Sequence, residues 1–235
     1  MSIRHNFCKV TIATREVVLI MRQFASTLCM VVVLQGFPAI VQAQAQPVQQ
    51  PTDPIEQVLA AKLMANYPDG QFHPELLINR AELASILVKA FHLDKRAAAN
   101  QENLIEVQDV PASHWAFNDI QTVLKTGIMK GYRGNMFFPN QKVTRAEAFA
   151  IFAQAYGVFQ FPDNTVEEIL AKYTDAASMP SWARKPFATA LNEGFVNIFE
   201  PNNIYPLQPM TRGDMAYALS KYLQRQQAPA SVLNN

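Results

Sequence analysis

Cysteine is scarce in this 235-residue chain, and neither sign of charge dominates it. The two cysteines, Cys8 and Cys29, both lie in the first 45 residues. If that region is removed, the mature protein has no cysteine, and packing alone must stabilise its fold. The 20 basic residues nearly cancel the 19 acidic ones. We therefore expect no nucleic-acid partner, because such partners are held largely by excess positive charge.

Sequence signatures of catalysis are also missing. The chain contains no glycine-rich phosphate loop, no spaced cysteine-histidine cluster and no serine nucleophile elbow. Its four histidines are dispersed, and the neighbouring Glu167 and Glu168 cannot share a helix face as an acid-base pair. The sequence therefore predicts a protein that is not an enzyme and that needs neither a metal nor a cofactor.

The beginning of the chain has the pattern of an export signal. Residues 24–34 form an apolar segment that follows Met21-Arg22, and small residues beyond it offer cleavage sites. This segment is too short to predict a transmembrane span, so we expect none in the mature form. We interpret residues 1–45 as a signal peptide, with Met21 as a candidate true start. Residues 46–53, rich in glutamine and proline, are interpreted as a linker.

The remaining chain contains an internal repeat in three copies. Two arginine-to-arginine intervals of 65 and 67 residues separate three similar tetrapeptides, and a proline lies six residues before each arginine. In copies two and three a tryptophan, Trp115 or Trp182, lies 30 residues before the arginine. Such constant spacing predicts three structural repeats. The tetrapeptides are Asn79-Arg80-Ala81-Glu82, Thr144-Arg145-Ala146-Glu147 and Thr211-Arg212-Gly213-Asp214.

Each tetrapeptide predicts the start of a helix. Its first residue is a good N-cap, and its acidic fourth residue can reach back to the backbone N–H of the cap, which makes a capping box. An apolar run of helical spacing follows each one. The arginine thus takes the first helical position, where the helix dipole disfavours a cation. Its presence in all three copies needs another explanation.

A further helix is predicted before the arginine motif in copies two and three. A stripe of apolar residues has helical spacing there, a serine is a candidate N-cap and a glycine marks the end. Each unit is therefore a helix, a loop with an aromatic-proline corner and a second helix. The stripe of copy two is Ala116, Ile120, Val123 and Leu124; the N-caps are Ser113 and Ser181; the stops are Gly127 and Gly194; and the corner residues expected in the core are Phe137, Phe138 and Tyr205.

These motifs together resemble the S-layer homology (SLH) family. The resemblance covers residues 54–224, and it is partial in the first copy and divergent in the third. It places repeat 1 at 54–100, repeat 2 at 101–160 and repeat 3 at 161–225, followed by a disordered tail at 226–235. Copy two carries the family pattern through Asp109-Val110, His114-Trp115-Ala116, Gly127-Ile128, Gly131-Tyr132, Phe138-Pro139 and Thr144 to Glu147.

The resemblance implies an all-α fold, in which three helix-loop-helix repeats form a pseudo-threefold helical bundle with grooves between them. It also implies a non-catalytic, exported module that attaches to the bacterial cell envelope by binding an acidic cell-wall polysaccharide or a peptidoglycan-linked polymer. One alternative is an envelope scaffolding or adaptor protein whose repeats bind another protein. An enzyme of wall metabolism is a third class, which the missing catalytic motifs disfavour.

The candidate ligand-binding residues each have a structural alternative. The arginines could grip an anionic group in a groove or could order a neighbouring repeat, since a guanidinium serves both purposes. The tryptophans could stack on a sugar or pack between repeats. The aspartates could accept hydrogen bonds from sugar hydroxyls or cap a loop. The candidates are Arg80, Arg145 and Arg212; Trp115 and Trp182; Asp109 and Asp175; and the groove-lining Tyr67 and Tyr132.

Overall fold

Each arginine motif begins a helix, as its capping box predicts. The computed structural model of the protein describes residues 53–97, 103–157 and 161–227. In it the three trailing helices, α2 (Arg80–Phe91), α5 (Arg145–Tyr156) and α8 (Arg212–Gln227), all start at the arginine. Capping boxes close the starts of α2 and α5. At α8, Thr211 and Asp214 exchange the same pair of hydrogen bonds, of 3.0 and 3.1 Å.

The other helices precede or follow the trailing helices in each repeat. The described residues form no β-strand, and only isolated β-bridges join their loops. The prediction of an all-α fold in three repeats is therefore confirmed. The remaining elements are α1 (Pro54–Ala60), α3 (Leu93–Ala97), α4 (Phe117–Lys125), α6 (Asp163–Leu170), a 3₁₀ turn η1 (Ala176–Ser178) and α7 (Ser181–Asn192).

The N-caps predicted at Ser113 and Ser181 are wrong. Helix α4 starts four residues after Ser113, because a tight turn comes first: the N–H of Phe117 donates to the carbonyl of His114 over 2.9 Å. Helix α7 starts at Ser181 itself, and Pro180 occupies the cap position without a side-chain hydrogen bond. Neither α4 nor α7, the leading helices that precede the arginine motif in repeats 2 and 3, relies on a side-chain cap.

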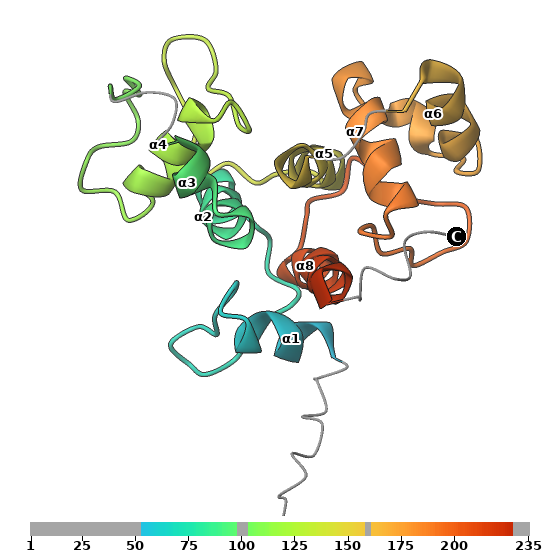
Figure 1. Ribbon diagram of the computed structural model, residues 1–235, viewed down its shortest axis with the longest axis horizontal. Helices are drawn as coiled ribbons and strands as arrows, with labels where there is room; N and C mark the ends of the chain where they lie inside the picture. The colour runs from blue at the N-terminus through green and yellow to red at the C-terminus, as the bar shows by residue number, and fades with distance from the viewer. Residues whose placement is uncertain (1–52, 98–102, 158–160, 228–235) are drawn as a thin grey trace, which may run out of the picture. The chain divides into compact units, whose positions relative to one another are not determined.

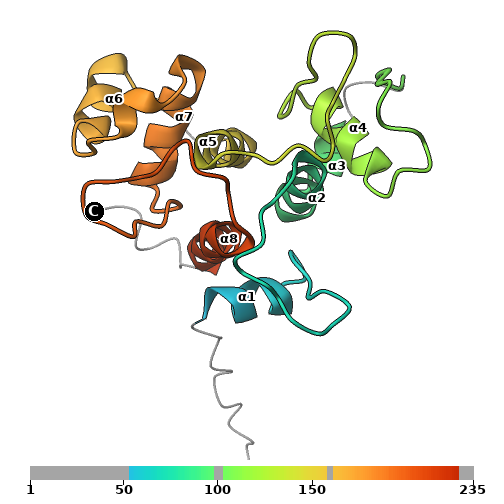
Figure 2. The ribbon, with the colours of Figure 1, turned by 180° about the vertical axis from the view of Figure 1, so that it is seen from behind.

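The leading helix of each repeat packs on the trailing helix of the preceding repeat. Helix α4 of repeat 2 packs on α2 of repeat 1, α7 of repeat 3 packs on α5 of repeat 2, and α1 of repeat 1 packs on α8 of repeat 3. The order is cyclic. Figure 1 shows α2, α5 and α8 almost end-on near the middle of the view, and Figure 2 shows the same neighbours from behind. This arrangement is consistent with the predicted pseudo-threefold bundle.

An aromatic cluster joins the three trailing helices toward their C-terminal ends. The ring of Phe91 on α2 contacts Phe152 on α5 at 5.1 Å and Tyr222 on α8 at 4.9 Å, measured between centroids. Tyr156 on α5 lies 5.8 Å from Tyr222 and 5.1 Å from Phe195. Edge-to-face pairs of this kind add to the stabilisation from burial. One continuous core thus serves all three repeats.

The ends of the chain are only partly described. Asp53, the last residue of the predicted linker, caps α1 by accepting a hydrogen bond from the N–H of Ile55. Helix α8 continues to Gln227, two residues beyond the predicted end of repeat 3. The predicted signal peptide, the rest of the linker and residues 228–235 lie outside the described residues. Among the helices that are described, none combines the length and the apolar character that crossing a membrane requires.

Candidate functional site

Each repeat arginine inserts its side chain into the loop of the next repeat. In every copy the arginine Nε donates to the backbone carbonyl of the residue two positions before the corner proline of the next repeat. Nη2 donates to the carbonyl of the residue seven positions before that one. The three arginines therefore fasten repeat 1 to 2, repeat 2 to 3 and repeat 3 to 1. The Nε bonds run from Arg80 to Phe137 (2.7 Å), from Arg145 to Ile204 (3.1 Å) and from Arg212 to Phe72 (2.9 Å); the Nη2 bonds run to Lys130 (2.8 Å), Asn197 (2.8 Å) and Ala65 (2.6 Å).

Backbone hydrogen bonds also join the repeats, in the same cyclic order. The N–H groups of the arginine and of the residue after it, which have no partner inside their own helix, donate to carbonyls beside the next repeat's corner proline. These loops thus satisfy two of the four open donors at each helix start. The bonds run from Arg80 and Ala81 to Gln141 and Pro139 (both 3.0 Å), from Arg145 and Ala146 to Gln208 and Pro206 (both 2.8 Å), and from Arg212 and Gly213 to Leu76 and Pro74 (both 2.8 Å).

This geometry supports the structural alternative for the arginines. All three arginines are buried, and each guanidinium lies over an aromatic ring of the next repeat. The distance to the ring centroid is below 5 Å for Arg80 and Arg212, and it is 5.4 Å from Arg145 to Phe199. Burial lowers the pKa of both Arg80 and Arg145 below the ordinary value, and nearby acidic groups partly offset this effect. The cation at an unfavourable helix end is thus explained by the carbonyls and rings that surround its charge.

Arg145 differs from the other two in the use of its last nitrogen. Its Nη1 pairs with the buried carboxylate of Asp214 at 2.8 Å and also donates to the side chain of Asn197 at 2.9 Å. The equivalent Nη1 atoms of Arg80 and Arg212 make no hydrogen bond within the described residues. Arg80 and Arg212 thus each keep one donor that no described residue uses, and each lines a groove, whereas Asp214 occupies this position at Arg145.

Among the grooves between repeats, three lie beside the arginine contacts, and they include most of the candidate residues. Their volumes are about 230, 450 and 540 Å³ for the first, second and third groove. The first includes Tyr67, Glu82, Lys89, Trp115 and Arg212. The second includes Arg80, Tyr132, Glu147, Gln154 and Trp182. The third includes Asp53, Glu75, Phe199, Asp214 and Tyr217.

The first and second grooves have the same construction. Each combines a tyrosine from one repeat, a tryptophan from the next and the arginine of the third. Trp115 and Trp182 are 65 % and 51 % exposed, so neither serves mainly as core. The guanidinium of Arg80 lies 4.8 Å from the ring of Tyr132, and that of Arg212 lies 4.6 Å from Tyr67. Each of the two grooves is thus lined by an exposed indole, a guanidinium and a phenol.

The two candidate aspartates do not line any of these grooves. Asp109 accepts hydrogen bonds from the N–H groups of Phe137 and Phe138 at 2.8 and 2.6 Å. Asp175 does the same for Ile204 and Tyr205, the latter at 2.7 Å. Both carboxylates anchor the corner loop of their own repeat, which supports the structural alternative. Ligand binding by Asp109 and Asp175 stays a prediction, and neither residue lines one of the three grooves.

The corner loop has a strained residue just before its proline. Phe138 and Tyr205 have φ angles of 56° and 48°, a left-handed conformation that bulky residues rarely adopt. Phe138 is 41 % exposed and Tyr205 is half-buried, so the expectation that they lie in the core is wrong, whereas Phe137 is fully buried as expected. The aspartate bonds hold the strained backbone in place, because a local cost of this kind needs surrounding structure to fix it.

Replacing Asp109 by alanine should therefore destabilise the protein by about 1–3 kcal/mol, because two backbone donors lose their acceptor. Denaturant unfolding monitored by circular dichroism measures this loss. Asp119→Ala, an acid-to-alanine change on α4, is the matched control and should leave stability nearly unchanged. Equal effects of the two substitutions would contradict the anchoring role of Asp109.

In repeat 1 the equivalent loop residue, directly before the corner proline, is a histidine whose ring contacts two acidic side chains. His73 has a φ of 53°, and its ring nitrogens contact Asp69 at 2.6 Å and Glu75 at 3.1 Å. The hydrogen bond with Asp69, followed by that with Glu75, raises the pKa of His73 above its ordinary value of 6.5. The charged ring is thus favoured in the folded loop. Its stabilisation is fully present below pH 6.5 and is lost as the pH rises through the raised pKa.

An NMR titration of the His73 imidazole is expected to show this raised pKa. Asp69→Asn should return the pKa toward its ordinary value, because the charged partner is removed. His92, which lies at the end of α2 away from this acid pair, serves as the internal control. A titration of His73 that Asp69→Asn leaves unmoved would contradict the contact.

Several groove residues escaped the sequence analysis. Glu82 and Lys89 both line the first groove, and Glu147 and Gln154 take the equivalent places in the second. The seven-residue spacing places each pair on one face of a helix, two turns apart, and this signal could have indicated them. Within the described residues, no three histidine, cysteine or acidic side chains lie close enough together to hold a metal ion.

The fold and grooves agree with the comparison of the chain with known families. A family model described as the S-layer homology domain matches residues 46–84, 108–149 and 172–216, which together make up more than half of the chain. The chain belongs to the S-layer homology domain family. Its three matched segments correspond to the three repeats.

Curated relatives share these repeats. The chain is 28 % identical over 181 residues to a surface-layer 125 kDa protein of Lysinibacillus sphaericus, covering 76 % of this chain and 14 % of that protein. It is 28 % identical over 175 residues to an amylopullulanase of Thermoanaerobacterium thermosulfurigenes, covering 74 % and 9 %. It is 28 % identical over 174 residues to a cellulosome-anchoring protein of Acetivibrio thermocellus, covering 74 % and 38 %. The chain thus matches much less than two thirds of the length of these relatives.

Proposed function

We propose that this protein is a non-catalytic module that attaches non-covalently to the bacterial cell envelope. In this proposal the first and second grooves bind an acidic glycan of the cell wall. Two of the relatives are named for a surface layer and for cellulosome anchoring, which supports attachment as the shared task. The relatives also include an amylopullulanase, of which this chain covers only 9 %, so that name gives no reason to assign the repeats a reaction.

The construction of the first two grooves carries the proposal. An exposed tryptophan offers an apolar face to a sugar ring, as amphipathic aromatic side chains do at wet interfaces. The Nη1 atom of Arg80 or Arg212 offers a charge-assisted hydrogen bond to a carboxylate or phosphate on the same glycan. Lys130 lines the second groove and Lys89 the first, which adds positive charge to each. A glycan with both a sugar face and an acid group fits this pair of features.

The third groove is not expected to bind such a glycan. Asp53, Glu75 and Asp214 line it, and the arginine behind it is already paired. Thirty residues before Arg80, where the other copies have a tryptophan, the sequence has Gln50. An acidic polymer would therefore meet carboxylates there instead of a free cation. This groove gives most support to the alternative function, an adaptor that binds a protein.

Co-sedimentation with purified cell-wall sacculi tests the attachment. We expect saturable binding to sacculi that carry their polysaccharide, and competition by the same polysaccharide released into solution. Sacculi stripped of polysaccharide should bind much less protein. Moderate salt should weaken the binding only partly, because stacking does not depend on ionic strength whereas an exposed ion pair does. Equal binding to intact and stripped sacculi would contradict glycan recognition, and no binding to either would leave a protein partner as the better interpretation.

A further inference from the structure

The third groove has the chemistry of a site for a positively charged, partly apolar group. Phe199 is 64 % exposed and Ile198 is 40 % exposed, and both line it. The half-buried rings and chains of Tyr217 and Ile55 continue the apolar surface. Side chains of this size gathered in one concave place are typical of a contact surface rather than of scattered exposure.

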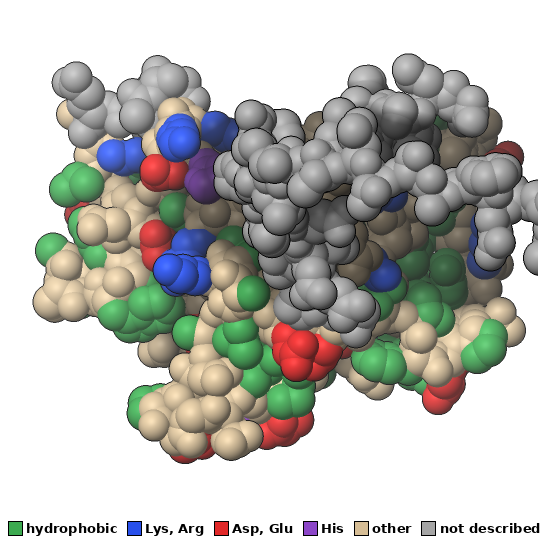
Figure 3. Space-filling model, turned by 60° about the horizontal axis from the view of Figure 1, so that its bottom comes forward, with side chains coloured by type: hydrophobic (Ala, Val, Ile, Leu, Met, Phe, Trp, Pro, Cys, Tyr) green, Lys and Arg blue, Asp and Glu red, His purple; other side chains and the backbone are tan. Residues whose placement is uncertain are grey.

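Two exposed carboxylates border this apolar surface. Asp53 uses one oxygen to cap α1, and Glu75 uses one oxygen to contact His73, so each keeps its second oxygen for an incoming donor. Both residues are exposed, whereas Asp214 is spent on Arg145. On the face that Figure 3 turns forward, acidic and hydrophobic side chains likewise lie next to each other. An arginine matches such a groove, because its guanidinium pairs with carboxylates and also stacks on aromatic faces.

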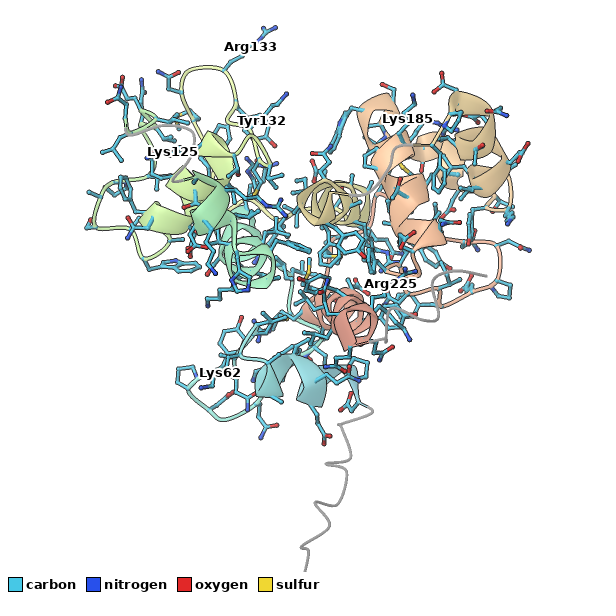
Figure 4. The ribbon with its side chains drawn as sticks, viewed as in Figure 1. Lys62, Lys125, Tyr132, Arg133, Lys185 and Arg225 are labelled. Atoms are coloured by element: carbon cyan, nitrogen blue, oxygen red, sulfur yellow. The ribbon has the colours of Figure 1, made fainter. Side chains whose placement is uncertain are left out.

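The chain itself presents an arginine of this kind. Arg133 lies in the turn of repeat 2, which closes through a hydrogen bond of 2.7 Å from the N–H of Tyr132 to the carbonyl of Met136. Gly134 and Asn135 both have positive φ angles, which the tight turn requires. Figure 4 shows Arg133 at the tip of this loop, pointing away from the helices. Within the described part of the chain, its guanidinium makes no ion pair and no hydrogen bond.

We propose that the turn of one copy, with Arg133 at its tip, docks into the third groove of a second copy. The guanidinium pairs with the free oxygens of Asp53 and Glu75, and its plane stacks on Phe199. This contact uses neither of the first two grooves, so it does not depend on glycan binding.

The contact predicts a particular kind of assembly. The turn belongs to repeat 2, and the groove lies between repeats 3 and 1, so the two surfaces are different parts of the chain. In Figure 4 Arg133 stands at the top of the view, and α1, which carries part of the groove, lies at the bottom. A head-to-tail contact between unlike surfaces continues as an open chain unless its rotation closes a ring, and the placement of the two surfaces at opposite sides of the view favours the open chain. The copies should therefore form open chains that lengthen with concentration.

Sedimentation velocity on the purified protein tests this assembly. The wild type is expected to sediment faster as its concentration rises, and this increase should shrink at high salt, since exposed charge pairs are screened. Arg133→Glu should weaken the association by about tenfold or more, because like charges then face each other in the contact. Glu75→Lys should have the same effect from the groove side. Circular dichroism establishes that each variant is folded.

Mixing the two variants provides the sharpest result. The reversed turn of one variant meets the reversed groove of the other, and the remaining native turn meets the remaining native groove. Association is therefore expected to return in the mixture, although each variant alone associates only weakly. The matched controls reverse charge elsewhere: Lys125→Glu on α4 and Glu56→Lys on α1 should associate as the wild type does.

Three results would overturn the proposal. The first is a wild type that stays monomeric at every concentration in low salt. The second is association that Arg133→Glu and Glu75→Lys leave unchanged. The third is a mixture of the folded variants that remains as dissociated as each variant alone, which would show that the two surfaces do not meet. None of these results bears on binding to the cell wall, which is measured separately with sacculi.

Discussion

Substituting Arg145 with methionine is expected to destabilise the protein by about 3–5 kcal/mol, because it leaves a buried carboxylate without its counter-charge. Asp214 is 3 % exposed and Arg145 is 1 % exposed, so water cannot replace the lost partner. The carbonyls of Ile204 and Asn197 also lose their donors. Methionine fills much of the space of the arginine stem, so the loss reports charge and hydrogen bonding more than a cavity.

A double-mutant cycle separates the ion pair from the rest of the effect. Arg145→Met combined with Asp214→Leu should recover part of the stability, since it removes the unpaired carboxylate, whereas the loss of the Asp214 cap on α8 remains. Arg80→Met is the matched control in the second groove, where no buried carboxylate depends on the arginine, and it should cost less. Denaturant unfolding measures all five proteins: the wild type, Arg145→Met, Asp214→Leu, their combination and Arg80→Met. A loss for Arg80→Met as large as that for Arg145→Met would argue against a special role of the pair.

Removing both groove tryptophans should abolish most binding to cell-wall sacculi. We expect Trp115→Ala combined with Trp182→Ala to weaken binding by about thirtyfold or more, as large aromatic contacts at the centre of an interface commonly do. Each single substitution should leave the other groove intact and so have a smaller effect. Both side chains are more than half exposed, so the fold should tolerate their loss.

Phe199→Ala is the matched control for the tryptophans. Its ring is 64 % exposed, close to the 65 % of Trp115, but it lines the third groove. Wall binding of this variant should equal that of the wild type when the protein is dilute. Binding that survives the loss of both tryptophans in folded protein would contradict recognition in the first and second grooves. Binding lost in Phe199→Ala instead would move the site to the third groove.

The local features of the fold could be predicted from the sequence. Three helices begin at the arginine because an N-cap and an acid three residues later satisfy open N–H groups, and all these partners lie within four residues of each other. The repeat was equally readable, because its spacing is a property of the chain alone. The family resemblance rested on the same short motifs, and its implied all-α fold is confirmed.

The partners of the long-range contacts could not be predicted in this way. The sequence predicts three helix-loop-helix units that associate in one bundle, but not which helices pack together; in the structure each leading helix packs on the trailing helix of the preceding repeat. Arg212 bonds to Ala65, which lies 147 residues away. The sequence shows a guanidinium but not which acceptors the fold brings to it, and for this reason the arginines could be interpreted as ligand-binding or structural with equal merit. The location of the tryptophans in grooves remained equally open.

The cyclic order of the arginine contacts between repeats affects when the protein can finish folding as it is synthesised. In an open array of repeats, each new repeat could settle on the one before it as soon as it is synthesised. Here repeat 1 completes its packing only against α8, so its loop waits for Arg212. Contacts between such distant segments form late and slowly. A growing chain therefore cannot close the ring of repeats until α8 has been made, so repeat 1 stays incompletely packed for most of synthesis.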